Sequence, residues 1–236
     1  MFTMLALKIK RQENGFYALL YRSAKAVVFF NIPTVKIIHL PLYHLDRWVR
    51  ETARHLFHVC WSIPLFKARC ERVGKNLRLP NGIPYLEGSN LRLIVGDNVT
   101  IGRSTIGASK VYDEAILSIG SNSTIGYGSI ISVSREVTIG DHCMIAPGCL
   151  IMDSDDHPVN PEKRLRNEPV DRADVLPVRI GSNVWIGCDC SVLKGVTIGD
   201  NAVIGTRSVV TRDVEQNAVY AGYPARPTLR NLEKRK

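Results

Sequence analysis

The chain has 236 residues, enough for one large domain or for one domain with a substantial extension. Apolar residues make up 45% of it, an ordinary share for a globular protein, which excludes disordered and collagen-like classes. The net charge of +9 resides in residues 1–90, which hold 14 Lys and Arg against 5 Asp and Glu, while residues 91–236 hold 17 of each. The larger part of the chain therefore needs no nucleic acid or other polyanion as a partner.

Residues 1–90 are predicted to form a basic, partly helical extension. Leu45, Trp48, Val49 and Leu56 recur at spacings of three and four, which predicts two or three short helices bracketed by prolines. We expect these helices to cap or flank the first turn of the domain that follows. The arginines at helical spacing in this extension fit either a solvated face or a helix lying on an anionic membrane surface.

The sequence predicts a cytoplasmic protein, with peripheral contact at the inner face of the membrane as the alternative. The apolar stretch 24–42 is interrupted by Lys25, Pro33 and Lys36, so it does not read as a spanning helix. The first residues lack the pattern of a secretory signal. The six cysteines show no CxxC spacing, which favours reduced thiols that fill a core.

An internal repeat dominates the rest of the chain. An aliphatic residue recurs every six positions within four runs: Val95 and Ile101; Ile119, Ile125 and Ile131; Ile139, Ile145 and Ile151; and Ile180, Ile186, Val192, Ile198, Ile204 and Val210. A period of six fits neither an α-helix of 3.6 residues per turn nor a plain strand of period two. It predicts short strands joined by tight turns, with three strands forming a triangular coil of about 18 residues that stacks into a solenoid.

This pattern resembles the hexapeptide-repeat acyltransferases over about residues 91–228. The resemblance implies a mainly β fold, a left-handed parallel β-helix, preceded by the helical extension 1–90 and followed by a charged tail at 229–236. It also implies acetyl-CoA as co-substrate, a homotrimer, and active sites formed between neighbouring subunits. Residues 132–138 loosen the repeat slightly, and 158–177, rich in proline and charge, are predicted to be a loop expelled from the coil.

His157 is the predicted general base. It ends the segment Ile151-Met-Asp-Ser-Asp-Asp-His157, where the chain enters the expelled loop, and the resemblance to maltose, galactoside and nodulation-factor O-acetyltransferases places the base here. A sugar hydroxyl becomes a good nucleophile when a base takes its proton, and imidazole suits this task near neutral pH. Either Asp153 or Asp155 is expected to orient the ring.

The resemblance assigns the coenzyme A contacts to the later coils. Trp185, in the segment Asn183-Val-Trp185, is expected beside the thioester, and the backbone at Gly187 and Cys188 is expected to bind the pantetheine arm and the oxyanion. In the terminal motif Gly222-Tyr-Pro-Ala-Arg226, the arginine is expected to bind the phosphates of coenzyme A. The other expected contacts are Arg230, Thr206, Thr211 and Arg212.

The acceptor is the least determined part of the prediction. Ser132 or Ser134 occupies the place of a polar acceptor contact in the relatives, and Asp153 is a further candidate. The acidic residues that small-sugar enzymes supply from a helical domain have no clear counterpart. The pattern, with its long basic extension, resembles O-acetyltransferases that modify precursors of bacterial exopolysaccharide, O-antigen or capsule. The resemblance implies O-acetylation of a saccharide that is carried on a membrane lipid.

Three other functions fit part of the sequence pattern. An amine on a nucleotide-sugar, an antibiotic or serine are alternative acceptors. A non-catalytic scaffold would explain the solenoid but not the His157, Trp185 and Arg226 motifs together. A zinc-dependent carbonic anhydrase of the same fold needs three His ligands, whereas the repeat region has only His142 and His157, so no metal is expected.

Overall fold

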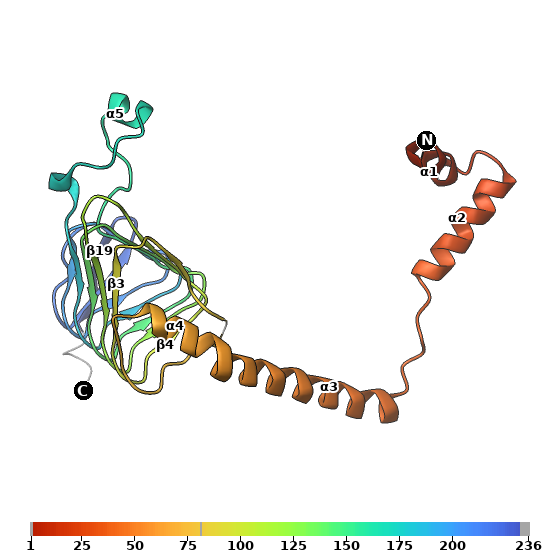
Figure 1. The fold of residues 1–236 in the computed structure, drawn as a ribbon, viewed down its shortest axis with the longest axis horizontal. Coiled ribbons are helices and arrows are strands. Elements are labelled where there is room, and N and C mark those ends of the chain that lie inside the picture. Colours follow the sequence, from red (N-terminus) through yellow and green to blue (C-terminus); the bar gives the residue numbers. More distant parts are fainter. Residues whose placement is uncertain (1, 81, 232–236) are drawn as a thin grey trace. The chain divides into compact units, whose positions relative to one another are not determined.

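The computed structural model describes residues 2–80 and 82–231, together with the side chains of 4–80 and 82–228. Contacts divide the chain into a unit that ends at Thr52 and a unit that begins at Ala53 (Figure 1). The first holds helices α1 (Phe2–Arg11) and α2 (Gly15–Val28) and most of α3 (Lys36–Phe57). No side chain described between residues 4 and 52 is buried, so this unit has no core of its own.

The helices of the first unit begin and end differently from the prediction. Asn14 caps α2, its side chain accepting a hydrogen bond from the Tyr17 amide at 2.9 Å. Helix α3 runs for 22 residues through Pro41, which was expected to bracket shorter helices. Proline removes one hydrogen bond and can kink a helix, but it does not always end one.

The second unit opens with the end of α3, a π-helical turn (His58–Ser62) and α4 (Ile63–Arg69). Phe66 of α4 is 1% exposed and belongs to the main core. Helix α4 therefore closes the first coil, as a capping helix was predicted to do.

Three parallel sheets form the faces of the β-helix, and the chain visits them in turn (Figure 1). Sheet A consists of β1 (Arg72–Val73), β3 (Leu91–Val95), β6 (Ala115–Ile119), β9 (Glu136–Ile139), β12 (Val178–Ile180) and β15 (Thr197–Ile198). Sheet B consists of β4 (Thr100–Ile101), β7 (Thr124–Ile125), β10 (Met144–Ile145), β13 (Trp185–Ile186), β16 (Val203–Ile204), β18 (Ala218–Gly222) and β19 (Ala225–Asn231). Sheet C consists of β2 (Tyr85–Glu87), β5 (Thr105–Ala108), β8 (Ile130–Val133), β11 (Leu150–Met152), β14 (Ser191–Val192) and β17 (Val209–Val210).

The predicted solenoid is confirmed, and it extends beyond the predicted repeat at both ends. Strands β1 and β2 lie before residue 91 and pair in parallel with β3 and β5. In their coil only Val73 and Leu79 are six residues apart, and Leu86 follows after seven, so the pattern did not reveal it. At the other end β19 turns back antiparallel on β18 and takes in residues 229–231 of the predicted tail. Residues 232–236 lie outside the described part of the chain.

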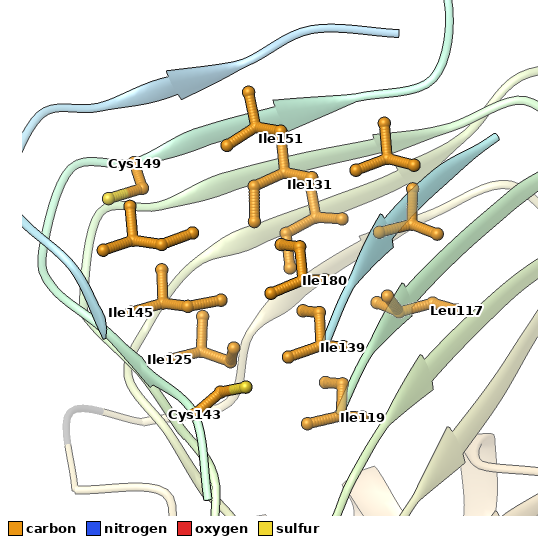
Figure 2. Close-up of a cluster of buried hydrophobic side chains, with 14 of the residues drawn as sticks. Leu117, Ile119, Ile125, Ile131, Ile139, Cys143, Ile145, Cys149, Ile151 and Ile180 are labelled. Atoms are coloured by element: carbon orange, nitrogen blue, oxygen red, sulfur yellow. The ribbon is translucent and has the colours of Figure 1, made fainter. Parts of the chain in front are cut away.

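The aliphatic residues that recur every six positions point into the interior of the coils. Ile125, Ile131, Ile145 and Ile151 are each at most 1% exposed and stack in register along the interior (Figure 2). Burying one such side chain stabilises the fold by roughly 1.5–3 kcal/mol, so the stacked rungs supply the main stabilisation.

Three of the six cysteines fill positions in this core, as predicted: Cys143, Cys149 and Cys190. Burial raises the pKa of the Cys143 thiol above its usual range. Cys70, beside α4, is half-buried, and its burial raises the pKa of the thiol to about 11.

The turn from sheet A to sheet B, called the AB corner, carries a ladder of polar side chains. Its turn residues have φ between 55° and 60°, a region that Asn tolerates better than other side chains: Asn76, Asn98, Asn122, His142, Asn183, Asn201 and Asn217. Neighbouring amides bond to each other, as in Asn98 Nδ2 to Asn122 Oδ1 at 2.9 Å. His142 occupies one rung of this ladder, which gives it a structural position.

Candidate functional site

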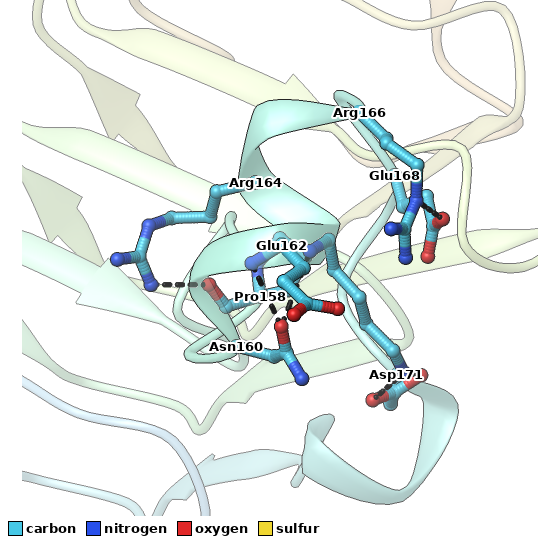
Figure 3. A network of polar contacts seen from close by, with 8 residues as sticks. Pro158, Asn160, Glu162, Arg164, Arg166, Glu168 and Asp171 are labelled. Carbon is cyan, nitrogen blue, oxygen red and sulfur yellow. Dashed lines mark hydrogen bonds and ion pairs between the residues drawn. The ribbon is translucent and has the colours of Figure 1, made fainter.

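A long excursion leaves the β-helix where sheet C turns into sheet A, here called the CA corner. It runs from residue 153 to 177, between β11 and β12, and so begins earlier than the predicted 158–177. It contains α5 (Pro161–Leu165) and a 3-10 turn (Arg172–Asp174). Asn160 caps α5 by accepting from the Glu162 amide at 2.8 Å (Figure 3).

The excursion is held against the loop 109–114, which leaves the same corner two coils earlier. Val111, Val170 and Val175 form a small buried cluster between the two segments. The guanidinium of Arg172 lies 4.9 Å from the centre of the Tyr112 ring, and its Nε donates to the Val111 carbonyl at 3.1 Å. These contacts anchor the excursion to loop 109–114.

Asp153 is the buried anchor of this corner. Its side chain is fully buried, and its carboxylate accepts three backbone hydrogen bonds, from the amides of Ser134, Arg135 and Glu136, at 2.6–2.8 Å. Burial raises the pKa of the Asp153 carboxyl, and the three amides oppose that rise. Asp153 thus closes the turn between β8 and β9, the place where the repeat loosens.

His157 is exposed on the excursion, and no described residue hydrogen-bonds to its ring. Its backbone amide donates to the Asp155 carbonyl at 2.6 Å. The Asp155 carboxylate accepts from Lys194 Nζ at 2.6 Å, in the next coil. Within one chain the His157 ring is therefore available to a ligand or to a second copy of the chain.

Serine hydroxyls link successive coils at the CA corner, where the excursion begins. Ser132 is partly exposed and donates to the Asp156 carboxylate at 2.7 Å. Ser134 is fully buried, and its hydroxyl bonds to Ser109 and Ser154, each at 2.7 Å. Of the two serines predicted to contact the acceptor, only Ser132 is accessible.

Trp185 lies on a different side of the β-helix. It points outward from sheet B and is 52% exposed, with Met144 and Val203 as its neighbours in register on the adjoining strands. His157 is on the CA corner, which joins the other two sheets. The structure therefore does not bring Trp185 and His157 together within one chain.

The remaining predicted contacts divide between two corners. Gly187, Cys188 and Thr206 stack at the turn from sheet B to sheet C, the BC corner. A side chain at Gly187 would meet the Thr206 amide nitrogen at 2.6 Å, so the glycine is required by the close stacking of the coils. Thr211 and Arg212 follow β17 at the CA corner, and both are exposed.

Arg226 lies in β19, at the edge of sheet B, and is exposed. Among the described residues its guanidinium donates only to the carbonyl of neighbouring Ala225, at 3.0 Å, so it retains capacity for an anion. The Arg230 side chain lies outside the described residues. Sequence reasoning missed Arg207, an exposed arginine that follows Thr206 in sequence. Its backbone has a positive φ of 60°.

A cleft of about 660 Å³ opens beside the CA corner, next to the base of the excursion. It is lined by Tyr112, Asp113, Glu114, Ile116, Arg135 and Glu136. Sequence reasoning missed this cleft, and it missed Lys194 as the partner of Asp155. Both depend on which coils the excursion lies against, and the six-residue period carries no signal for that.

Metal ligands do not gather in the described part of the chain. No three His, Cys, Asp or Glu side chains described there lie close enough to hold an ion. His142 and His157, the pair considered for zinc, stand at the AB and CA corners.

Comparison with known proteins agrees with the repeat. The family model "Bacterial transferase hexapeptide (six repeats)" matches residues 177–212, and "Hexapeptide repeat of succinyl-transferase" matches residues 116–151. Both matches fall on coils of the β-helix.

The curated relatives include galactoside O-acetyltransferase of Escherichia coli (strain K12), 43% identical over 46% of this chain and 51% of its own length. Nodulation protein L of Rhizobium meliloti (strain 1021) is 46% identical over 47% of this chain and 57% of its own length. The chain thus spans about half the length of the curated relatives it matches.

A solved structure gives the same fold. A hexapeptide-repeat-containing acetyltransferase from Vibrio cholerae is 25% identical, with a TM-score of 0.50 over 72% of this chain and 78% of that chain. The likeness covers a large part of the unit that begins at Ala53.

Proposed function

Because this chain belongs to the hexapeptide-repeat transferase family, we propose that it moves an acetyl group from acetyl-CoA to a hydroxyl group of a saccharide. The observation that carries the proposal is His157, exposed on an ordered excursion and free of partners among the described residues. A histidine with a purely structural role does not need to be presented to solvent on an anchored loop. A general base requires both a fixed position and access to the substrate.

The chemistry assigned to His157 is a proton transfer. Its ring takes the proton from the acceptor hydroxyl while the oxygen bonds to the acetyl carbon. The bond between that carbon and sulfur then breaks, and the proton passes to the departing thiolate. Asp155, bonded to Lys194, lies two residues from His157 and is the better candidate to orient the ring, because Asp153 is committed to three backbone amides.

The chain's residues fit coenzyme A as co-substrate. Trp185, Gly187 and Thr206 lie along sheet B and the BC corner, where an extended pantetheine arm can run along the coils. Arg212 and Arg226 are exposed cations suited to phosphate groups, with Arg230 as a further candidate. The Gly187 amide donates to the Ile204 carbonyl at 2.8 Å, so the Cys188 amide is the proposed donor for the negative charge that develops on the acetyl oxygen.

We propose a homotrimer whose active sites lie between copies. The outer face of sheet A is charged and ion-paired, with Arg92 bonded to Glu71 and Glu114. The outer faces of sheets B and C carry apolar side chains instead: Met144, Trp185, Val203, Tyr85, Ile130, Leu150 and Val209. Packing sheet B of one copy against the CA corner of the next would join Trp185 to His157.

The acceptor is proposed to be a sugar of a bacterial surface polysaccharide, carried on a lipid at the inner face of the cytoplasmic membrane. The cleft beside the CA corner supports a saccharide, because Tyr112, Arg135 and Glu136 offer an aromatic ring and charged hydrogen-bonding groups. Ser132, partly exposed and bonded to Asp156, is the serine proposed to contact the acceptor. An amine on a nucleotide-sugar, an antibiotic or serine is the alternative acceptor.

The experiment is thiol release from acetyl-CoA across a panel of saccharides. Acceptor-dependent release is expected for the wild type and is expected to fall by about 10²–10⁴-fold in His157→Ala. His142→Ala is the matched control, because it removes an exposed histidine from another corner and should keep activity. Equal activity in His157→Ala would refute the role of the base, and a chain that binds no coenzyme A in calorimetry would be a scaffold.

A further inference from the structure

The helical unit exposes an unusual amount of apolar surface. Its largest exposed side chains lie in and around the connection between α2 and α3: Val27, Val28, Phe29, Phe30, Ile32 and Ile37 are 65–87% exposed. Since no side chain described in residues 4–52 is buried, nothing within the unit covers them. Large contiguous apolar surface of this kind marks a site of interaction.

Helix α3 sorts its side chains onto two faces. Ile38, Leu42, Leu45 and Val49 follow one another at spacings of three and four, and Leu56 comes seven residues after Val49, which places all of them on one side. The opposite side carries Lys36, Arg47, Arg50 and Arg54. A helix with a wide apolar face and a basic opposite face is typical of segments that lie in a bilayer interface.

The helical unit carries a net positive charge. Residues 1–52 hold eight Lys and Arg against three Asp and Glu. Two of the three acids pair along α3, Asp46 with Arg50 and Glu51 with Arg47, both at 2.8 Å. Exposed cations on α1 and α2, such as Lys10 and Arg22, have no acidic partner among the described residues.

We propose that this unit binds the surface of an anionic phospholipid membrane. The apolar face of α3 and the segment from Val27 to Ile32 enter among the acyl chains, and the basic side chains contact lipid phosphates. The membrane is met from one side, because no helix in the described chain has the length and apolarity to cross it. A second copy of the unit is a poorer partner, since it brings more positive charge to the same surface.

The proposal does not depend on the catalytic one. A surface-bound helical unit would hold the β-helix near lipid-linked acceptors, yet it would bind vesicles whether or not acetyl transfer occurs.

The test is sedimentation of the full chain with vesicles. We expect the protein to pellet with an equal mixture of phosphatidylcholine and phosphatidylglycerol, less with phosphatidylcholine alone, and less in high salt. Absence of binding to the mixed vesicles would overturn the proposal. Thiol release measured on the same preparation separates a failure of membrane binding from a failure of catalysis.

Two variants and two controls sharpen the test. Replacing Phe29 and Phe30 together with serine should abolish pelleting, while the control Leu165→Ser removes an equally exposed apolar side chain from α5 and should not. Arg22→Glu should lower vesicle affinity by at least about fivefold, and Arg103→Glu, in the β-helix, should leave it unchanged. If the phenylalanine variant instead lowers the oligomeric state while vesicle binding persists, a second copy covers this surface and the proposal is wrong.

Discussion

At the scale of single residues, Asp153 and His157 show how neighbours in sequence take different tasks. The sequence placed both in the candidate site, because a carboxylate near a histidine is the usual orienting partner. The structure buries Asp153 beneath the excursion, where its carboxylate binds three backbone amides. Four residues later the chain is exposed, and no described residue hydrogen-bonds to the His157 ring. Asp153 thus fixes the point of the chain from which the proposed base, His157, is presented.

Replacement of Asp153 by alanine is predicted to destabilise the β-helix. The amides of residues 134–136 would lose their acceptor inside the protein, which costs about 1–3 kcal/mol per unsatisfied group in the worst case. We expect a loss of about 3 kcal/mol in the free energy of unfolding, measured with urea. Asp155→Ala, at an exposed site, should change it by less than about 1 kcal/mol. Equal effects of the two changes would contradict the assigned role.

Cys70 predicts a loss of stability in alkali. Its pKa is raised to about 11 by burial, whereas an unfolded thiol titrates near 8.5. Between these values the unfolded chain binds fewer protons than the folded one, so the free energy of unfolding falls as pH rises from about 8.5 to about 11. Urea unfolding across this range should show a smaller fall in Cys70→Ala than in the wild type. A steeper fall in the variant would refute this account.

At the scale of elements, the excursion is the part that sequence reasoning described least well. Proline and charge indicated a segment outside the coil, and that was correct. They gave no indication of α5, whose cap at Asn160 was not recognised, or of the contact with loop 109–114. That contact joins residues about 60 positions apart, and no local pattern encodes it.

Arg172→Ala is predicted to loosen the excursion without unfolding the β-helix. The change removes the contact with the Tyr112 ring and the bond to the Val111 carbonyl. Limited trypsin digestion should then cut faster after Lys163, Arg164 and Arg166, while the free energy of global unfolding changes by less than about 1 kcal/mol. Arg166→Ala, which breaks only an exposed ion pair with Glu168, is the control for stability. Unchanged digestion in Arg172→Ala would show that the anchor is unimportant.

The strands illustrate why part of the fold was predictable. Each inward side chain of a coil must be aliphatic and of similar size, so a period of six was visible wherever the coils are regular. The first coil is irregular, with Pro80 and Pro84 between β1 and β2, and only its pairing with the next coil reveals it.

At the scale of the whole molecule, the three faces of the β-helix differ in chemistry. Charged pairs cover sheet A, and apolar ladders run along sheets B and C. The sequence predicted the candidate residues, but which of them share a face follows from the coil order. That order separates Trp185 from His157 and makes a second copy necessary for a site that uses both.

Met144→Glu is therefore predicted to disrupt the proposed trimer. Met144 is 57% exposed on sheet B beside Trp185, and a carboxylate there would be buried against the apolar face of a neighbour. Sedimentation equilibrium should show monomers. Thr138→Glu, on the polar face of sheet A, should leave the trimer intact. A trimer that tolerates Met144→Glu would place the interface elsewhere.

The most direct test of a shared active site is complementation between two inactive chains. His157→Ala and Trp185→Ala, each expected to lose acetyl transfer alone, are co-expressed in equal amounts so that mixed trimers form. If His157 of one copy works with Trp185 of the next, about a quarter of the sites are intact and about a quarter of wild-type thiol release returns. Mixed trimers without recovered activity would contradict a site built between copies of this chain.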